Sequence, residues 1–191
     1  PEFGAASAEC LAEALVGVED AEVAFTAHSI PAAMARECDY AAQLTETGRL
    51  VAEACGVDPG RWQMVYQSRS GRPSQRWLEP DICDFLRDLP SQSGPADVVV
   101  APIGFLSDHL EVLYDLDTEA RGVCEQMGIN MIRAATVGHH PRLIQMIREL
   151  IVERISEQPL WLALGDAGPA HDVCPADCCP SGTEGREGGK E

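Results

Sequence analysis

The sequence lacks the features that would place the protein in a membrane or on a nucleic acid. No apolar run approaches the roughly 20 residues that a membrane-spanning helix needs, so we expect no stable membrane insertion. Only 14 residues are basic against 31 acidic ones, and the formal net charge is -17. A surface this negative repels phosphate backbones, and we therefore expect no nucleic-acid partner.

Two further absences concern the start of the chain and its cysteines. The first residues lack the basic start and apolar run of a secretory signal, which predicts a cytoplasmic protein. The cysteines lack the two spaced CxxC pairs that a four-cysteine zinc site prefers. What the chain does have is 191 residues with 45% apolar and 24% charged side chains. This composition is typical of a globular domain with a core.

Apolar runs alternate with amphipathic segments along the chain and predict an α/β fold. The clearest strand is 96–105, whose near-continuous apolar residues suit a parallel strand that is covered on both faces. Strands alternating with helices predict an open, doubly wound parallel sheet of four strands. The expected strands are 23–26, 61–68, 96–105 and 129–135, and the expected helices after them are 40–55, 78–89, 106–128 and 141–156.

The periodicity ends near Pro159, where glycine, proline and charged residues replace it. We therefore divide the chain into an α/β domain over 1–158, a cysteine-bearing tail over 159–180 and a last segment over 181–191. The composition of this last segment predicts disorder.

Two of the expected strands are followed by side chains that can carry chemistry. Ligands of open parallel sheets bind beyond the carboxyl ends of the strands. His28 stands at the end of the first strand, and His109 and Glu111 follow the third. A lone histidine is more often a satisfied hydrogen-bonding group, but an imidazole and a carboxylate together can bind one divalent ion. The pair His28 and Glu111 is therefore the sharpest candidate site.

The helix after the third strand carries a row of carboxylates. Glu111, Asp115 and Glu119 stand at i, i+4 and i+8 and share one helical face. Like charges at this spacing destabilise a helix. The row therefore either faces water or has a cation beside it.

Eight cysteines raise the question of metal, disulfides or packing. In a reducing cytosol, crowding in a short segment favours a metal site. An iron–sulfur cluster accepts varied spacings and a distant fourth thiolate, for which Cys10 is one candidate. Free thiols or an adventitious zinc site remain the alternative. The crowded cysteines are Cys174, Cys178 and Cys179, and those expected in the core are Cys38, Cys55, Cys83 and Cys124.

Three motifs together resemble the ferrochelatase family. They are FTAHSIP (25–31), YQSRSG with WLEP (66–80) and VVVAPIGFLSDHLEVLYDLD (98–117). The resemblance runs in order from about residue 8 to 157. The stretch WLEPDICDFL and the cysteine-bearing tail look most like the actinobacterial branch, whose members are similar to coproporphyrin ferrochelatases. It implies insertion of Fe2+ into coproporphyrin III, or into protoporphyrin IX, during haem biosynthesis.

The resemblance also implies roles for single residues. The family's metal-binding histidine falls on His28 and its partner carboxylate on Glu111, while Asp115 and Glu119 continue a secondary path for metal or protons. The residues expected to line the substrate are Ser29, Trp77 and His109. The cysteine arrangement of cluster-bearing relatives implies a 2Fe-2S cluster on Cys10, Cys174, Cys178 and Cys179.

One departure from the family concerns length. Family members have two similar α/β domains with the porphyrin held between them, and this chain matches only the second. A complete enzyme would therefore need the first domain as well. The alternatives are a non-catalytic metal-binding or iron–sulfur module and a cobalt or nickel chelatase of the same fold.

Overall fold

A parallel sheet forms the centre of the molecule. The computed structural model describes residues 1–93, 97–165 and 168–174. Within this part of the chain the sheet has four strands in the order β2-β1-β3-β4, and every neighbouring pair is parallel. This confirms the predicted α/β fold. The strands are β1 (Glu22–His28), β2 (Trp62–Gln67), β3 (Asp97–Ala101) and β4 (Asn130–Arg133).

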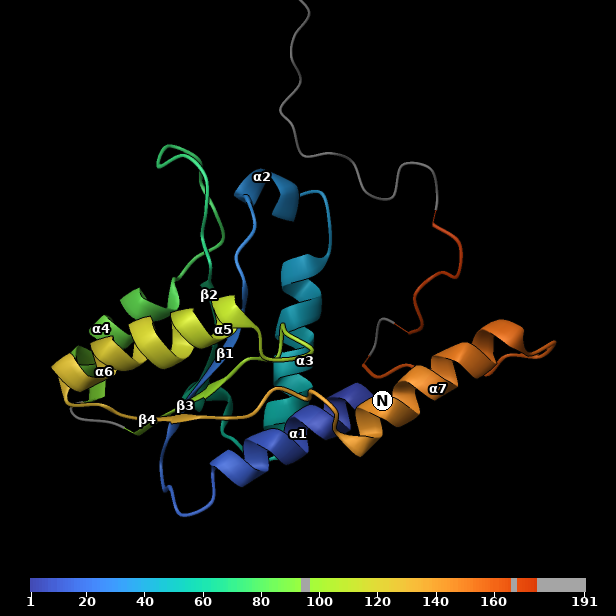
Figure 1. Ribbon diagram of the computed structural model, residues 1–191, viewed down its shortest axis with the longest axis horizontal. Helices are drawn as coiled ribbons and strands as arrows, with labels where there is room; N and C mark the ends of the chain where they lie inside the picture. Colours follow the sequence, from blue (N-terminus) through green and yellow to red (C-terminus); the bar gives the residue numbers. More distant parts are fainter. Residues whose placement is uncertain (94–96, 166–167, 175–191) are drawn as a thin grey trace, which may run out of the picture.

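Helices cover both faces of this sheet. In Figure 1, α1 and α3 lie on one side of the strands, and α4, α5 and α6 lie on the other. The helices are α1 (Glu2–Ala14), α2 (Ala32–Ala35), α3 (Tyr40–Ala54), α4 (Ile82–Ser93), α5 (Leu110–Tyr114), α6 (Arg121–Met127) and α7 (Pro141–Ile155). A 3₁₀ turn, Pro59–Arg61, precedes β2, and a π-helical segment, Asp115–Ala120, joins α5 to α6.

The alternation of side chains along each strand builds two core layers. Val23 and Phe25 of β1 pack in a cluster with residues of α1 and α3, whereas Ala24 packs with residues of α4 and the α5–α6 region. In β3, Val99 belongs to the first layer, and Val98 and Val100 belong to the second. Because neighbouring residues of a strand point to opposite faces, strands buried on both faces are apolar throughout.

The strand order places a crevice at the carboxyl ends of the two central strands, β1 and β3. The chain leaves β1 toward β2 on one side and leaves β3 toward β4 on the other, although β1 and β3 are direct neighbours. Such a reversal opens a space outside the carboxyl ends of the two central strands. His28 ends β1, and the loop before α5 follows β3, so both flank this space.

Gly104 lets the loop after β3 lie directly against the end of β1. A Cβ atom at this position would stand 2.4 Å from the Cβ of Ala27 and 2.7 Å from its Cα. The backbone N–H of Gly104 donates to the carbonyl oxygen of Thr26 at 3.0 Å. No larger residue fits without moving the loop, so glycine fixes how closely α5 approaches the residue after Ala27, which is His28.

The expected helix over 106–128 is shorter and divided. It begins at Leu110, because the His109 side chain caps it by accepting from the backbone N–H of Val112 at 3.5 Å. It then continues as α5, the π-helical segment and α6, and ends at Gly128 in the left-handed conformation. The periodicity of the sequence does not distinguish a π turn from an α turn.

Two other boundaries also differ from the expected ones. The strand expected over 96–105 ends at Ala101, because Pro102 has no N–H to continue the ladder. The helix expected from residue 78 begins at Ile82. The preceding residues pair in extended form, since Leu78 donates to Ile30 and Pro80 accepts from Tyr66.

The last helix is only partly covered. α7 packs on α1, and Leu143 is buried there. Four isoleucines of α7 are exposed, namely Ile144, Ile147, Ile151 and Ile155. Neither 156–165 nor 168–174 contains a helix or strand, although Arg154 forms an ion pair with Asp172. In the described part of the chain, no helix combines the length and apolarity needed to cross a membrane.

Candidate functional site

The structure brings the predicted pair together at the crevice. The Nε2 atom of His28 lies 3.7 Å from an Oε1 atom of Glu111, and both side chains are partly exposed. Metal–nitrogen and metal–oxygen bonds are about 2.1 Å long, so both atoms can contact one ion lying between them. This separation is also too long for a direct hydrogen bond.

Backbone contacts orient the imidazole of His28. Its Nδ1 atom lies 2.5 Å from the carbonyl oxygen of Ser29, which can only accept, so Nδ1 carries the proton. The hydroxyl of Tyr40 donates to the carbonyl of His28 at 2.8 Å and holds the end of β1 from the α3 side. In the neutral ring the lone pair is therefore on Nε2, which faces Glu111.

Asp115 is held at the end of the neighbouring strand. Its carboxylate accepts from the Nε2 amide of Gln67 at 3.2 Å and from the hydroxyl of Ser68. Gln67 is 1% exposed, and its Oε1 atom has no hydrogen-bond partner in the structure. Ser68 has a φ of 61°, in the left-handed region that most residues avoid.

Sequence reasoning did not select Gln67 and Ser68. A usable signal was their position at the end of the expected strand 61–68, next to the strand that carries His28. His28 and Gln67 are in fact paired in register.

A third missed residue, Arg133, fixes the α5 region from the end of β4. Its guanidinium donates to both carboxylate oxygens of Asp108, at 3.1 and 3.0 Å, and lies 2.8 Å from Asp117 of the π-helical segment. Burial alone would lower the pKa of this guanidinium, but the two carboxylates more than offset it and the pKa is raised. Arg133 thus ties the loop before α5 and the helix after it to the sheet.

The acidic row is only partly assembled around the pair. Glu119 is exposed, and its charge acts on Cys83 of α4. Burial is the main reason that the pKa of Cys83 is raised to about 11, and the negative charges of Asp81 and Glu119 add to it. A group of three or more His, Cys, Asp or Glu side chains suited to a metal ion does not occur among the described residues.

The three predicted lining residues have structural contacts of their own. The hydroxyl of Ser29 donates to the carbonyl of Leu78 at 2.9 Å, and Ser29 is buried. His109 caps α5, and its ring packs edge-on against Phe105. Trp77 bridges to Pro31, and its buried indole N–H has no partner in the structure. Their role in lining a substrate stays a prediction.

An open cleft lies near the end of β1, although neither His28 nor Glu111 lines it. It has a volume of about 240 Å³ and lies between α1, α3 and the loop after β3. Tyr40 and Gly104 line it, and these residues also contact the end of β1. Ligand sites of drug-sized molecules have volumes of roughly 300–1,000 Å³. The volume of this cleft is below that range.

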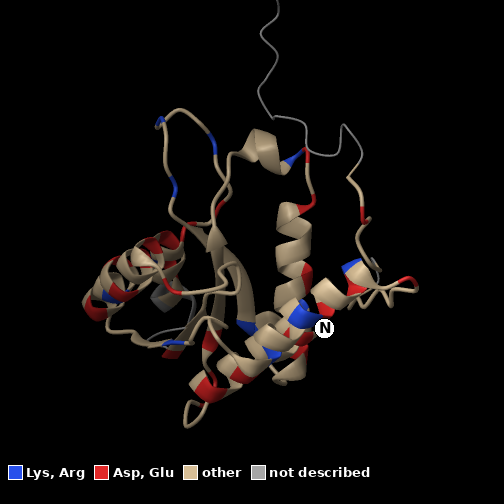
Figure 2. Ribbon diagram, turned by 45° about the vertical axis from the view of Figure 1, so that its right-hand side comes forward, with Lys and Arg blue, Asp and Glu red and all other residues tan. Residues whose placement is uncertain are grey.

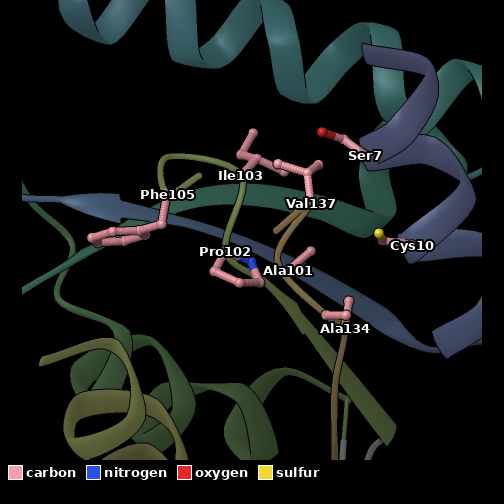
Figure 3. Close-up of a pocket in the computed structure, with 9 residues that line it drawn as sticks. Ser7, Cys10, Ala101, Pro102, Ile103, Phe105, Ala134 and Val137 are labelled. Atoms are coloured by element: carbon pink, nitrogen blue, oxygen red, sulfur yellow. The ribbon is translucent and has the colours of Figure 1, made fainter. Parts of the chain in front are cut away.

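Cys10 of α1 lies beside a small cavity. Figure 3 shows its sulfur directed into a cavity lined by Ala101, Pro102, Ala134 and Val137. The cavity volume is about 10 Å³, enough for one water molecule. Burial, with the charges of Glu13 and Glu9, raises the pKa of the Cys10 thiol.

The other three predicted cluster ligands belong to the tail. Cys174 is exposed. Cys178 and Cys179 lie outside the described residues. The 2Fe-2S cluster therefore stays a prediction.

Comparison with known proteins gives a consistent result. The ferrochelatase family model matches residues 1–155. A ferrochelatase of Rhodopirellula baltica is 50% identical over 184 residues, which are 94% of this chain and 52% of that protein. A coproporphyrin III ferrochelatase of Streptomyces griseus is 45% identical over 178 residues, which are 84% of this chain and 47% of that protein. The chain thus spans about half the length of these relatives.

Among solved structures, a putative cobalamin biosynthesis CbiX protein from Marinobacter aquaeolei shares 19% identity. It covers 70% of this chain, this chain covers 96% of it, and the TM-score is 0.44.

Proposed function

Because this chain belongs to the ferrochelatase family, we propose that it supplies the metal-handling half of an enzyme that inserts Fe2+ into coproporphyrin III during haem biosynthesis. The observation that carries the proposal is the pair His28 and Glu111, held 3.7 Å apart at the topological switch point of the sheet. Protoporphyrin IX is the alternative porphyrin. A cytoplasmic location stays a prediction.

The reaction sets the tasks of the residues. Fe2+ enters the macrocycle, two pyrrole N–H bonds break and two protons leave, while the iron keeps its oxidation state. The protein must therefore accept protons and hold a cation, and it needs no electron donor. A neutral imidazole and carboxylates can do both.

We assign the first proton to His28. Its Nδ1 proton is committed to the carbonyl of Ser29, so Nε2 is the free lone pair at the crevice. Once Nε2 has taken a pyrrole proton, the imidazolium lies beside Glu111, whose carboxylate stabilises the charge. The same two atoms can instead hold the incoming iron before insertion.

Asp115 and Glu119 would then lead protons or cations between the crevice and the surface. Asp115 has a fixed position, because Gln67 and Ser68 both donate to it. Glu119 lies one helical turn farther along and is exposed. This path is the less constrained part of the proposal.

The half-length coverage favours a second candidate function. The described residues form a cleft of about 240 Å³, which is small for a porphyrin. Alone, it could be a non-catalytic metal-binding module. The iron–sulfur cluster is kept outside both proposals, because two of its four predicted ligands, Cys178 and Cys179, lie outside the described residues.

Anaerobic insertion of Fe2+ into coproporphyrin III tests the enzymatic activity. The loss of porphyrin fluorescence measures the insertion. We expect His28→Ala to lower turnover by about 100-fold or more, because a general base of this kind contributes about that factor. His139→Ala, at an exposed histidine in the loop before α7, is the matched control and should leave turnover unchanged.

Near-normal turnover in His28→Ala would contradict the assignment. Turnover absent in the unsubstituted chain, together with binding of one Fe2+ that depends on His28 and Glu111, would favour the non-catalytic module.

A further inference from the structure

Most arginines of this acidic chain are paired with carboxylates. A chain with 31 acidic residues offers each arginine many partners. The paired arginines are Arg49, Arg61, Arg87, Arg121, Arg133, Arg142 and Arg154. Against this background, arginines without an acidic partner stand out.

The loop between β2 and α4 concentrates such arginines. It contains Arg69, Arg72 and Arg76, all exposed, and none of them forms an ion pair with a described residue. Figure 2 shows blue segments, which mark basic residues, on a loop that projects beyond the sheet. Arg36, at the end of α2, and Arg148 of α7 are likewise unpaired in the described part of the chain.

Internal hydrogen bonds shape this loop. The guanidinium of Arg69 donates to the carbonyl oxygens of Pro73 and Gln75, at 3.1 and 3.0 Å, and so closes the turn. The carbonyl of Arg76 accepts from the backbone N–H of Ala32 at 2.9 Å, which joins the loop to α2. Arg69 thus has a structural task, whereas the charges of Arg72 and Arg76 stay available.

The loop is continuous with the candidate site. It starts at Ser68, whose hydroxyl bonds to Asp115, and it ends in the segment that pairs with Pro31, just after His28 and Ser29. The site thus has acidic residues on one side, in α5 and the π-helical segment, and the arginine-bearing loop joins it on another side. A cation is attracted to the first side and an anion to the second.

We propose that Arg72 and Arg76 bind carboxylates on the rim of the tetrapyrrole while its centre faces His28 and Glu111. This inference rests on the proposed function and specifies its substrate class. Coproporphyrin III carries a propionate on each pyrrole ring, and protoporphyrin IX carries one on only half of them. Guanidinium groups bind carboxylates through two parallel hydrogen bonds, so the loop selects the porphyrin with more carboxylates.

Porphyrin titrations with the 191-residue chain test this proposal. We expect the double variant Arg72→Gln/Arg76→Gln to bind coproporphyrin III about fivefold to tenfold more weakly, the loss expected for two exposed ion pairs. Its binding should also become less sensitive to salt. Arg148→Gln removes an equally exposed, unpaired arginine from α7 and should bind like the unsubstituted chain.

Three outcomes would overturn the inference. In the first, the double variant binds coproporphyrin III as tightly as the unsubstituted chain does. In the second, the unsubstituted chain does not bind coproporphyrin III. In the third, the double variant binds the tetramethyl ester of coproporphyrin III more weakly by the same factor as the free acid. The ester has no free carboxylates, so an equal loss would mean a general change of the loop. If millimolar inorganic phosphate displaces the porphyrin, and the chain binds the acid and the ester equally well, the loop would be a phosphate site instead.

The inference and the proposed function fail separately. Porphyrin binding that depends on the arginines, without iron insertion, would support the inference and contradict the proposed enzymatic activity. If iron insertion is normal in the double variant but lost in His28→Ala, the proposed activity is supported and the inference is contradicted.

Discussion

The strand-end site and the predicted cysteine site differ in how the fold supports them. His28 and Glu111 come from different segments, and Gly104, Tyr40 and backbone hydrogen bonds hold them 3.7 Å apart. Cys10, by contrast, faces a cavity of about 10 Å³ lined mostly by apolar side chains, and Cys174 is exposed. Both sites were expected from motifs, but only the first has its predicted residues side by side among the described residues, since Cys178 and Cys179 lie outside them.

The difference shows what a motif needs before it predicts geometry. The carboxyl ends of parallel strands meet at one edge of a sheet, so residues placed there by sequence are brought together by topology. No such rule links a cysteine in α1 to a tail that follows α7. A site predicted from a strand-end histidine is therefore better supported than a site predicted from a cysteine whose resemblance to the family is equally clear.

Among the changes that test this comparison, we expect Arg133→Met to have the largest effect on stability and turnover. The change removes the partner of Asp108 and leaves Asp117 with Arg121 at 3.7 Å, and we expect it to lower the free energy of unfolding by about 2 kcal/mol. It should also lower the turnover number for iron insertion, because Glu111 and Asp115 lie on the helix that these carboxylates anchor. Urea unfolding and the insertion assay measure the two effects.

Arg133→Lys separates anchoring from charge. Lysine keeps the positive charge but cannot bind both oxygens of Asp108 at once. We expect it to restore part of the stability and part of the turnover, with KM for the porphyrin unchanged. Full activity in Arg133→Met would show that the site does not depend on this anchor.

A smaller effect is expected from Cys10→Ser. A hydroxyl in the apolar cavity should lower the free energy of unfolding by about 1 kcal/mol. If Cys10 is a ligand of the predicted 2Fe-2S cluster, the variant purified anaerobically should also lose the brown colour and the bound iron and sulfide. Unchanged iron and sulfide contents would remove Cys10 from the ligand set.

The smallest effect concerns thiol reactivity. We expect iodoacetamide at pH 8 to modify the exposed Cys38 and Cys174 first. Burial raises the pKa of Cys83 and of Cys124 to about 11, so roughly one thiol in a thousand is ionised at that pH. Their labelling should quicken about tenfold from pH 8 to pH 9. Peptide mass spectrometry measures each rate, and equal rates at all four thiols would contradict the described burial.

The fold was predictable because its signals are local. Apolar runs such as 96–105 and the helical spacing after them identify strands and helices, and parallel topology then places His28 near Glu111. Boundaries were less predictable. The start of α5 depends on the His109 cap, and the start of α4 depends on pairing between Leu78 and Ile30, two residues far apart in the sequence.

The remainder of the site depends on tertiary contacts. Gln67, Ser68 and Arg133 have no distinctive spacing, and their importance comes from the carboxylates that they hold. The π-helical turn was missed for a similar reason, because the sequence gives the order of the acidic residues but not the winding of the helix between them.

The isoleucines exposed on α7 have a consequence for how the chain behaves in concentrated solution. An apolar helix face attracts other copies, whereas a net charge of -17 drives them apart. Added salt shortens the range of the repulsion, to about 8 Å at physiological ionic strength, and leaves the apolar attraction in place. Colloidal stability is therefore greatest in dilute buffer, the opposite of a protein that salt helps to dissolve.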